Sequence, residues 1–252
     1  MASNFKSEMT FSWIDGAVLK IKHGMTGATG NVYCELHEFA DMGFMLHLLR
    51  PGDLFLDVGA NIGSYTVLSS KVCGARTIAF EPDSDATAAL ERNIEANDIA
   101  DLVSVRRIAL GDRDGEIAFT VGLDTMNRVA VQEDRIVQMV PIARLDAISE
   151  VAHPTFIKLD VEGYEQRVFA GAARVLASPS LLAIQSELCD GTISRTLNSF
   201  GFRQSFYDPF SRRLADMPFR DRSSNALYIK DIQIVRQRLA SAPYRKIAGR
   251  CL

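Results

Sequence analysis

The chain has 252 residues, of which 47% are hydrophobic and 23% charged, and its formal net charge is −3. This length and composition predict one sizeable hydrophobic core, and the slightly acidic balance argues against a nucleic-acid partner. The N-terminal residues lack the apolar stretch of a signal peptide and no apolar run is long enough to span a membrane, so we expect a cytoplasmic protein without an integral membrane segment.

The first 50 residues are predicted to form a small β/α extension. Residues 11–36 have the pattern of short strands separated by glycine turns. Residues 37–49 place apolar side chains at helical spacing, and Pro51 and Gly52 end that pattern. Because the extension precedes the first core strand, we expect it to act as a lid over a site in the main domain.

A main domain is predicted from residue 51 to residue 232, where apolar strands alternate with helices. This alternation is typical of a doubly wound, mainly parallel α/β sheet. Helices are expected at 63–73, 83–97, 164–178 and 192–201. Strands are expected at 54–58, 76–82, 103–111, 115–122, 138–148, 154–163 and 181–188, with a closing antiparallel pair at 205–209 and 224–231. The basic tail, residues 233–252, is predicted to be a solvated surface helix.

The first core strand ends in the sequence DVGANIG, residues 57–63, at the edge of the sheet where ligands bind in such folds. Gly59 and Gly63 allow the backbone to approach a ligand and to turn into a helix. A dinucleotide site requires G-x-G-x-x-G, but Asn61 occupies the second glycine position, where it obstructs a pyrophosphate. S-adenosylmethionine has no phosphate, and Asp57 suits its ammonium group as Asn61 suits its carboxylate.

Two further strand ends carry acids in the order that this cofactor needs. Glu81, followed by Pro82, ends the second strand, where a carboxylate can accept both ribose hydroxyls. Asp112 follows the third strand, where it can bond the adenine amino group. Because an acid after a strand is usually only a turn or cap residue, the ordered set of three carries the prediction.

The segments DVGANIGSYT, IAFEPD, ALGDRDGEIAFT, FIKLDVEGYEQRVFAGA and NALYI together resemble the FkbM family of S-adenosylmethionine-dependent methyltransferases. The resemblance covers roughly residues 30 to 230. It implies a Rossmann-like class I methyltransferase fold and O-methylation of a hydroxyl on a sugar, glycolipid, polysaccharide or other secondary metabolite. The acceptor is then a small molecule or a saccharide, and the oligomeric state is left open.

The same fold resemblance places the methyl acceptor at the end of the fourth strand. Asp160 is the first candidate for a catalytic and cofactor-contacting carboxylate, and Glu187 and His37 are further catalytic candidates. Alternation along the strand places Lys158 on the same face as Asp160, so a structural ion pair is the competing interpretation.

Three residues are predicted to line the acceptor site. They are Glu162, whose structural alternative is to cap the next helix, and Asn127 and Arg128, of which Arg128 has the alternative of a surface charge. Relatives in the family more often have a histidine at the position of Arg128. No metal is predicted, because Asp160, Glu187 and Asn61 supply hard oxygen ligands without a dedicated ligand cluster.

Two other classes of function stay open at this point. A nicotinamide-dependent oxidoreductase uses the same kind of sheet, although the glycine spacing argues against it. A non-catalytic module that binds S-adenosylmethionine is the second alternative, and the acids at the fourth and fifth strand ends argue against it.

Overall fold

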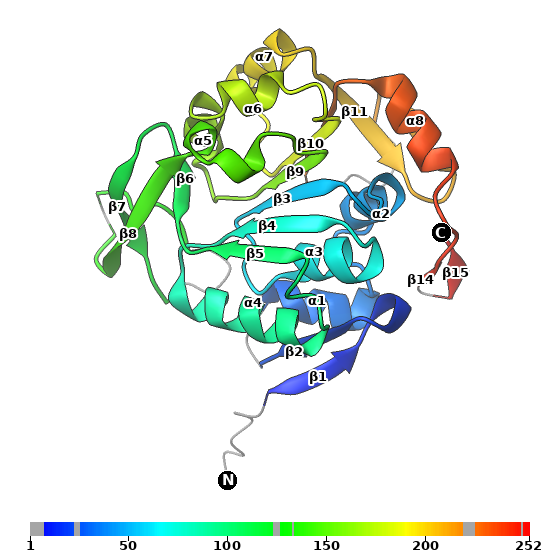
Figure 1. Ribbon diagram of the computed structural model, residues 1–252, viewed down its shortest axis with the longest axis horizontal. Coiled ribbons are helices and arrows are strands. Elements are labelled where there is room, and N and C mark those ends of the chain that lie inside the picture. The colour runs from blue at the N-terminus through cyan, green and yellow to red at the C-terminus, as the bar shows by residue number, and fades with distance from the viewer. Residues whose placement is uncertain (1–7, 23–25, 123–126, 133, 219–224, 248) are drawn as a thin grey trace.

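The computed structural model describes residues 8–22, 26–122, 127–132, 134–218, 225–247 and 249–252. Its centre is an eight-stranded sheet in the order β12-β11-β13-β10-β9-β3-β4-β5 (Figure 1). Five of these strands are parallel, as the alternation of strands and helices predicts. They are β3 (Leu54–Val58), β4 (Arg76–Phe80), β5 (Val103–Arg106), β9 (Phe156–Leu159) and β10 (Ala183–Ser186). The Rossmann-like α/β prediction is confirmed.

The strand order reverses at β3. The chain runs from β3 outward through β4 to β5, and later returns to the other side of β3 as β9 and β10. Ligands of doubly wound sheets bind at such a switch point, outside the carboxyl ends of the strands. The ends of β3 and β9, which carry Asp57 and Asp160, therefore meet at the position where this fold binds ligands.

Helices cover both faces of the sheet, and each face has its own hydrophobic cluster. One face packs against α2 (Phe39–Leu48), α3 (Ser64–Val67) with its π-helical continuation η2 (Leu68–Val72), α4 (Ser84–Ala96) and α8 (Ile232–Ala240). The other packs against α5 (Glu165–Ala170), α6 (Ala173–Ala177) and α7 (Gly191–Ser199). The N-cap of α4 is Asp83, whose side chain accepts from the N–H of Ala86.

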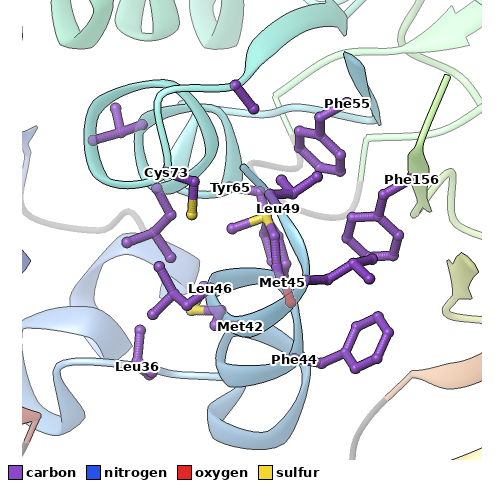
Figure 2. Packing of buried hydrophobic residues seen from close by; sticks show 14 of the residues in the cluster. Leu36, Met42, Phe44, Met45, Leu46, Leu49, Phe55, Tyr65, Cys73 and Phe156 are labelled. Carbon is purple, nitrogen blue, oxygen red and sulfur yellow. The ribbon is translucent and has the colours of Figure 1, made fainter. Parts of the chain in front are cut away.

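Aromatic side chains fix α2 against the centre of the sheet. Phe55 of β3 stacks on Phe156 of β9 with ring centroids 5.3 Å apart, and Phe44 of α2 meets Phe156 edge-on at 5.7 Å. Figure 2 shows Met45 beside these rings. All four side chains are fully buried, so these contacts anchor α2 on the sheet.

The N-terminal extension differs in part from its prediction. Two short strands are present, β1 (Met9–Ser12) and β2 (Val18–Ile21), with the 3₁₀ turn η1 (Ile14–Gly16) between them. The segment from Thr26 to Cys34, predicted as strand and turn, is the helix α1. Its fully buried Asn31 donates to Ser64 Oγ at 3.1 Å and accepts from the N–H of His37 at 2.9 Å, so tertiary contacts override a weak local propensity.

The predicted third strand divides into two. Its first part is β5, and its second part, β6 (Ala109–Gly111), leaves the main sheet and joins β8 (Val137–Arg144) and β7 (Gly115–Thr120) in a small three-stranded sheet. The helix predicted at 164–178 is also broken, between α5 and α6. A side chain at Gly171 would place its Cβ 2.0 Å from the carbonyl oxygen of Gly111, so the break lies where the chain packs directly on β6.

The C-terminal region closes the sheet and adds to its core. The antiparallel pair is present as β11 (Arg203–Asp208) and β13 (Ala226–Ile229), and β12 (Arg213–Ala215) extends the edge. The tail is less solvated than predicted, because α8 buries Val235 and Leu239 completely. The short pair β14 (Lys246–Ile247) and β15 (Arg250–Cys251) follows it, and 3₁₀ turns η4 (Leu145–Ala147) and η5 (Ser149–Val151) precede β9.

One hydrophobic cluster contains residues from all three predicted segments, including Leu19, Phe55 and Leu239. The boundaries at residues 50 and 232 stay predictions. Across the described ranges, no helix combines the length and apolar character that crossing a membrane requires.

Candidate active site

A cavity of about 440 Å³ opens at the carboxyl ends of β3, β4 and β9. This volume lies in the range of small-molecule sites, about 300–1,000 Å³. Of the predicted site residues, the cavity lining includes His37, Asp57, Gly59, Asn61, Glu81, Pro82, Asn127, Asp160 and Glu162. The sequence motifs from distant parts of the chain therefore meet around one space.

The turn after β3 is shaped by contact between two strand ends. Gly59 has φ +78°, and a Cβ there would lie 1.8 Å from the carbonyl oxygen of Asp160. Gly59 and Ala60 donate their N–H groups to the carbonyl of Phe80 at 3.0 and 3.1 Å, which joins the turn to β4 as well. Gly59 is thus required where three strand ends converge. Gly63 is outside the cavity lining, where φ +90° and the adjacent Leu90 side chain explain the glycine.

Asp57 and Asn61 are both held within this turn. Asp57 is almost completely buried, accepts from Thr66 Oγ1 at 2.6 Å, and has a raised pKa because burial disfavours its charge. Asn61 has φ +50°, and its Oδ1 accepts from the N–H of Ile62 at 2.7 Å. With the amide oxygen engaged in the turn, the Nδ2 donor of Asn61 is the group suited to a ligand carboxylate.

Glu81 lies buried at the end of β4, with one backbone donor on each carboxylate oxygen. Oε2 accepts from the N–H of Asn61 at 2.8 Å and Oε1 from the N–H of Asp83 at 2.9 Å. Burial raises the pKa of Glu81 to about 7, and the two N–H donors oppose that shift. Each oxygen retains lone-pair capacity beside the cavity, as binding of a pair of vicinal hydroxyls requires.

Lys158 and Asp160 form the ion pair that the strand alternation allows. Lys158 Nζ lies 2.7 Å from Asp160 Oδ2, and the two side chains are 5% and 30% exposed. Burial disfavours the charge of Lys158, but the carboxylates of Asp160, Glu38 and Asp57 outweigh it and raise its pKa. Burial likewise opposes the charge of Asp160, and Lys158 lowers its pKa below the usual value. Asp160 is thus a carboxylate with one oxygen held by an ammonium group.

Three carboxylates gather at the ends of β9 and β10. Asp160, Glu162 and Glu187 each offer an oxygen, and these oxygens all lie within 4.8 Å of one another. Glu187 is at the exposed rim rather than in the cavity lining. Partial loss of water and the neighbouring Asp160 carboxylate raise the pKa of Glu187 to about 8, and the same causes raise the pKa of Glu162.

Glu162 does not cap the following helix, which corrects the structural alternative for that residue. It has φ +54° in the turn before α5. Glu165 performs the backbone role instead, because its Oε1 accepts from the N–H groups of Val161 and Gly163 at 3.3 and 3.4 Å. The side chain of Glu162 is thereby left to the cavity and the carboxylate group.

Besides Gly63 and Glu187, two further predicted residues lie outside the cavity lining. Asp112 pairs with Arg167 Nη1 at 2.7 Å, and its pKa is lowered by that hydrogen bond. It lies beyond β6, which turns away from the main sheet, so the cavity wall there is formed by Ile108, Ala109 and Leu110 instead. Arg128 is also outside the lining and pairs with Asp134 at 3.1 Å, although its neighbour Asn127 does line the cavity.

The segment before α2 contributes more to the site than the sequence indicated. His37 is exposed but lines the cavity. Glu38, which no sequence motif indicated, also lines it, accepts from Tyr65 Oη at 2.7 Å and accepts from Asn225 Nδ2 at 2.8 Å. Buried Asn31 holds the backbone of His37. The signal available for Glu38 was its place beside His37, at the start of a helix with a strong apolar pattern.

The residues present fit S-adenosylmethionine. The close contact at Gly59 brings backbone to the cavity edge, buried Glu81 offers acceptors at the β4 end, and apolar side chains at 108–110 supply a wall for a base. A Rossmann-like sheet with these residues at its switch point has the architecture of a class I, S-adenosylmethionine-dependent methyltransferase domain.

Comparison with known proteins gives the family. The model for the "Methyltransferase FkbM domain" matches residues 57–206, more than half of the chain, and the chain belongs to that family. This confirms the resemblance and the cofactor class predicted from the motifs.

Two curated relatives and one solved structure illustrate the similarity. The chain is 28% identical over 145 residues to the hexuronic acid methyltransferase AglP of Haloferax volcanii, a match that covers 56% of this chain and 59% of that protein. It is 29% identical over 190 residues to the 31-O-demethyl-FK506 methyltransferase FkbM of Streptomyces tacrolimicus, a match that covers 60% of this chain and 71% of that protein. A solved structure from Pyrococcus horikoshii shares the fold at 13% sequence identity and a TM-score of 0.50. The match covers 89% of this chain and 71% of that chain.

Proposed function

We propose that this protein transfers a methyl group from S-adenosylmethionine to a hydroxyl of a sugar, glycolipid, polysaccharide or other secondary-metabolite acceptor. The observation that carries the proposal is the arrangement of one cavity. Glu81 and the turn at Gly59 lie at one part of its lining, and Asp160 and Glu162 lie at another. A donor site and an acceptor site thus share one space, which argues against a module that only binds the cofactor.

On the donor side, each predicted residue except Asp112 has a task. Glu81 accepts the ribose hydroxyls, Asn61 donates to the carboxylate of the methionine part, and Asp57 supplies negative charge for its ammonium group. Pro82 borders the cavity beside Glu81. Gly59 and Gly63 shape the turn, and Asp160 reaches both ligands from the end of β9. When bound, the cofactor supplies a methyl group already activated by a sulfonium.

On the acceptor side, the main task is alignment. Methyl transfer is an in-line displacement, so holding the acceptor oxygen about 3–3.5 Å from the methyl carbon supplies much of the rate. An alcohol must also lose its proton, and a carboxylate at Asp160, assisted by Glu187 or His37, is placed to orient the hydroxyl and to promote that loss. Glu162 and Asn127 border the acceptor. Arg128 is the weakest candidate, because its charge is paired with Asp134.

The proposed acceptor class rests on the relatives as well as on the site. One relative is named for a hexuronic acid and another for a 31-O-demethyl compound, a name that specifies O-methylation. This chain spans 59% of the length of the first of them, so its own acceptor is a proposal. The family membership sets aside the oxidoreductase alternative, and the acceptor we propose is a small molecule or saccharide rather than a nucleic acid.

A labelled-methyl screen tests the proposal. The protein is incubated with S-adenosylmethionine carrying an isotopic methyl group and with panels of sugar, glycolipid and polyketide hydroxyl compounds. We expect label in an alkali-stable ether on at least one panel, and loss of that product in Asp160→Asn. Label that appears on nitrogen or carbon, with none on oxygen, would overturn the O-methyl assignment.

A further inference from the structure

Glu38 is a carboxylate of the N-terminal segment that lines the cavity and belongs to none of the sequence motifs. Tyr65 Oη donates to its Oε2 at 2.7 Å, and Asn225 Nδ2 donates to its Oε1 at 2.8 Å. Tyr65 and Asn225 are only 5% and 4% exposed, so two buried donors from distant parts of the chain fix both oxygens of Glu38. Each carboxylate oxygen has two lone pairs and can accept a further hydrogen bond from a ligand.

The charge of the cavity lining is unbalanced. Among the described residues that line the cavity, six are carboxylates and one, Lys158, is a lysine. Such a lining favours a ligand with net positive charge. S-adenosylmethionine is a ligand of this kind, because it has a sulfonium, an ammonium group and a single carboxylate.

The parts of the donor follow one another in a fixed order, and the lining matches that order. The side chains at 108–110 form a wall for the base, and Glu81 at the end of β4 offers acceptors to the ribose. The amino-acid head extends from the ribose in the direction opposite to the base. Glu38 lies on that side, because it bonds Tyr65, whose ring centre is 4.7 Å from Lys158 Nζ, and β9 with Lys158 flanks β3 on the side opposite to β4.

We propose that Glu38 binds the ammonium group in the amino-acid head of S-adenosylmethionine and of its demethylated product. Asp57 is 1% exposed and its Oδ2 accepts from Thr66 at 2.6 Å, so we assign to Asp57 the supply of charge and to Glu38 the direct hydrogen bond. A hydrogen bond between two ionised groups is roughly twice as strong as one between neutral groups. The inference rests on the proposed function and deepens it, because it makes a residue of the N-terminal segment part of the donor site.

The competing role of Glu38 is purely structural, since its carboxylate joins Tyr65 of α3 to Asn225, the residue before β13. A structural role affects every ligand of the cavity alike. A contact with the ammonium group affects only the ligands that carry this group. Two ligands that differ in the amino group alone therefore separate the two roles.

Calorimetric titration of the full chain with the demethylated product, and with an analogue of it that lacks only the amino group, tests the contact. We expect the parent protein to bind the product about ten- to a hundredfold more tightly than the analogue, the range for a hydrogen bond to a charged group. In Glu38→Gln, affinity for the product should fall by about that factor, whereas affinity for the analogue should not fall. Glu116→Gln, at an exposed position on β7 outside the cavity lining, is the matched control and should keep the preference of the parent protein. Melting curves establish that each variant is folded.

Equal affinity of the parent protein for the product and for the analogue would overturn the inference, and that result needs no variant. The inference is also overturned by a Glu38→Gln protein that keeps the parent's preference, or by one that loses affinity for both ligands by the same factor. In each of these cases the product still binds to the parent protein, and the proposed function stands. A parent protein that binds neither ligand contradicts the proposed function and the inference together.

Discussion

Glu81 combines two roles at the level of a single side chain. It ties the turn after β3 to the end of β4 through the N–H groups of Asn61 and Asp83, and it presents the same carboxylate to the cavity. Burial raises its pKa to about 7, compared with an ordinary value of 4.5. Its ionisation is therefore costly to the fold: the stability linked to Glu81 is fully present below pH 4.5 and is lost as the pH rises through 7.

Cofactor binding should reverse part of that shift. Hydroxyl donors of the ribose favour the ionised form of Glu81, so binding at about pH 6 should release a proton. Calorimetric titration with S-adenosylmethionine at this pH, in two buffers of different ionisation enthalpy, should give different heats. Glu81→Gln removes the titrating group, and its heats in the two buffers should coincide. A glutamine variant with the same buffer dependence as the parent protein would show that the proton comes from another group.

Asp160 is the residue on which the acceptor chemistry depends. Asp160→Asn preserves shape but removes the charge, so turnover should fall by roughly 10²–10⁴, whereas cofactor affinity, which rests mainly on other residues, should fall much less. The loss is expected whether Asp160 accepts the proton or orients the hydroxyl. Single-turnover rates and calorimetry on the same preparation separate these two readouts.

The same substitution leaves Lys158 buried without its counter-charge, so the melting temperature should also fall. Lys158→Met in the double variant removes the unpaired charge and should restore part of the stability without restoring turnover. A stable Asp160→Asn protein with near-normal turnover would exclude Asp160 from the mechanism.

At the scale of elements, the contact between the ends of β3 and β9 assembles the site. Gly59→Ala should destabilise the protein strongly, because the new Cβ would lie 1.8 Å from the carbonyl oxygen of Asp160. Gly52 is a matched control, since it also has positive φ, +90°, but a Cβ added there would have no neighbouring heavy atom within 4 Å. Gly52→Ala should cost only the backbone term, about 1–2 kcal/mol.

Urea denaturation of both variants measures the difference, and the cofactor affinity of Gly59→Ala should fall with its stability. Equal destabilisation of the two variants would mean that the strand ends move apart without penalty and that the close contact does not shape the cavity.

The sequence predicted those elements whose patterns are set locally. Residues 54–58 and 156–159 are mainly apolar strands, and the acids at their carboxyl ends, Asp57 and Asp160, could be placed at one edge of the sheet from the sequence alone. Asp112 could not be placed, because nothing in its local sequence indicates that β6 leaves the main sheet to pair with β8. Glu38 was missed for a similar reason: its partners, Tyr65 and Asn225, are distant in sequence.

The N-terminal extension shows the limit of local propensity. The segment 26–34 contains two glycines and has a weak helical pattern, yet buried contacts of Asn31 with Ser64 and His37 accompany a helix there. The break between α5 and α6 is likewise set by a tertiary contact, between Gly171 and Gly111.

At the scale of the whole molecule, the two ends of the chain belong to the same core as the site. Leu239 of α8 is fully buried in the cluster that also contains Phe55 and Phe156, whereas Ile234 on the same helix is 43% exposed. Leu239→Ala should therefore lower the free energy of unfolding by about 2–5 kcal/mol, and Ile234→Ala should cost far less. Chemical denaturation measures both variants. Equal stability of Leu239→Ala and Ile234→Ala would show that α8 does not contribute to the hydrophobic core.

The central claim is that the cavity binds S-adenosylmethionine as methyl donor, and titration calorimetry with four ligands tests it most directly. We predict that S-adenosylmethionine and its demethylated product each bind to the same single site and that NAD and NADP give no binding heat. In Glu81→Ala, the affinity for S-adenosylmethionine and for its product should fall about ten- to a hundredfold. Tight binding of NAD, with no response to the demethylated product, would contradict the account.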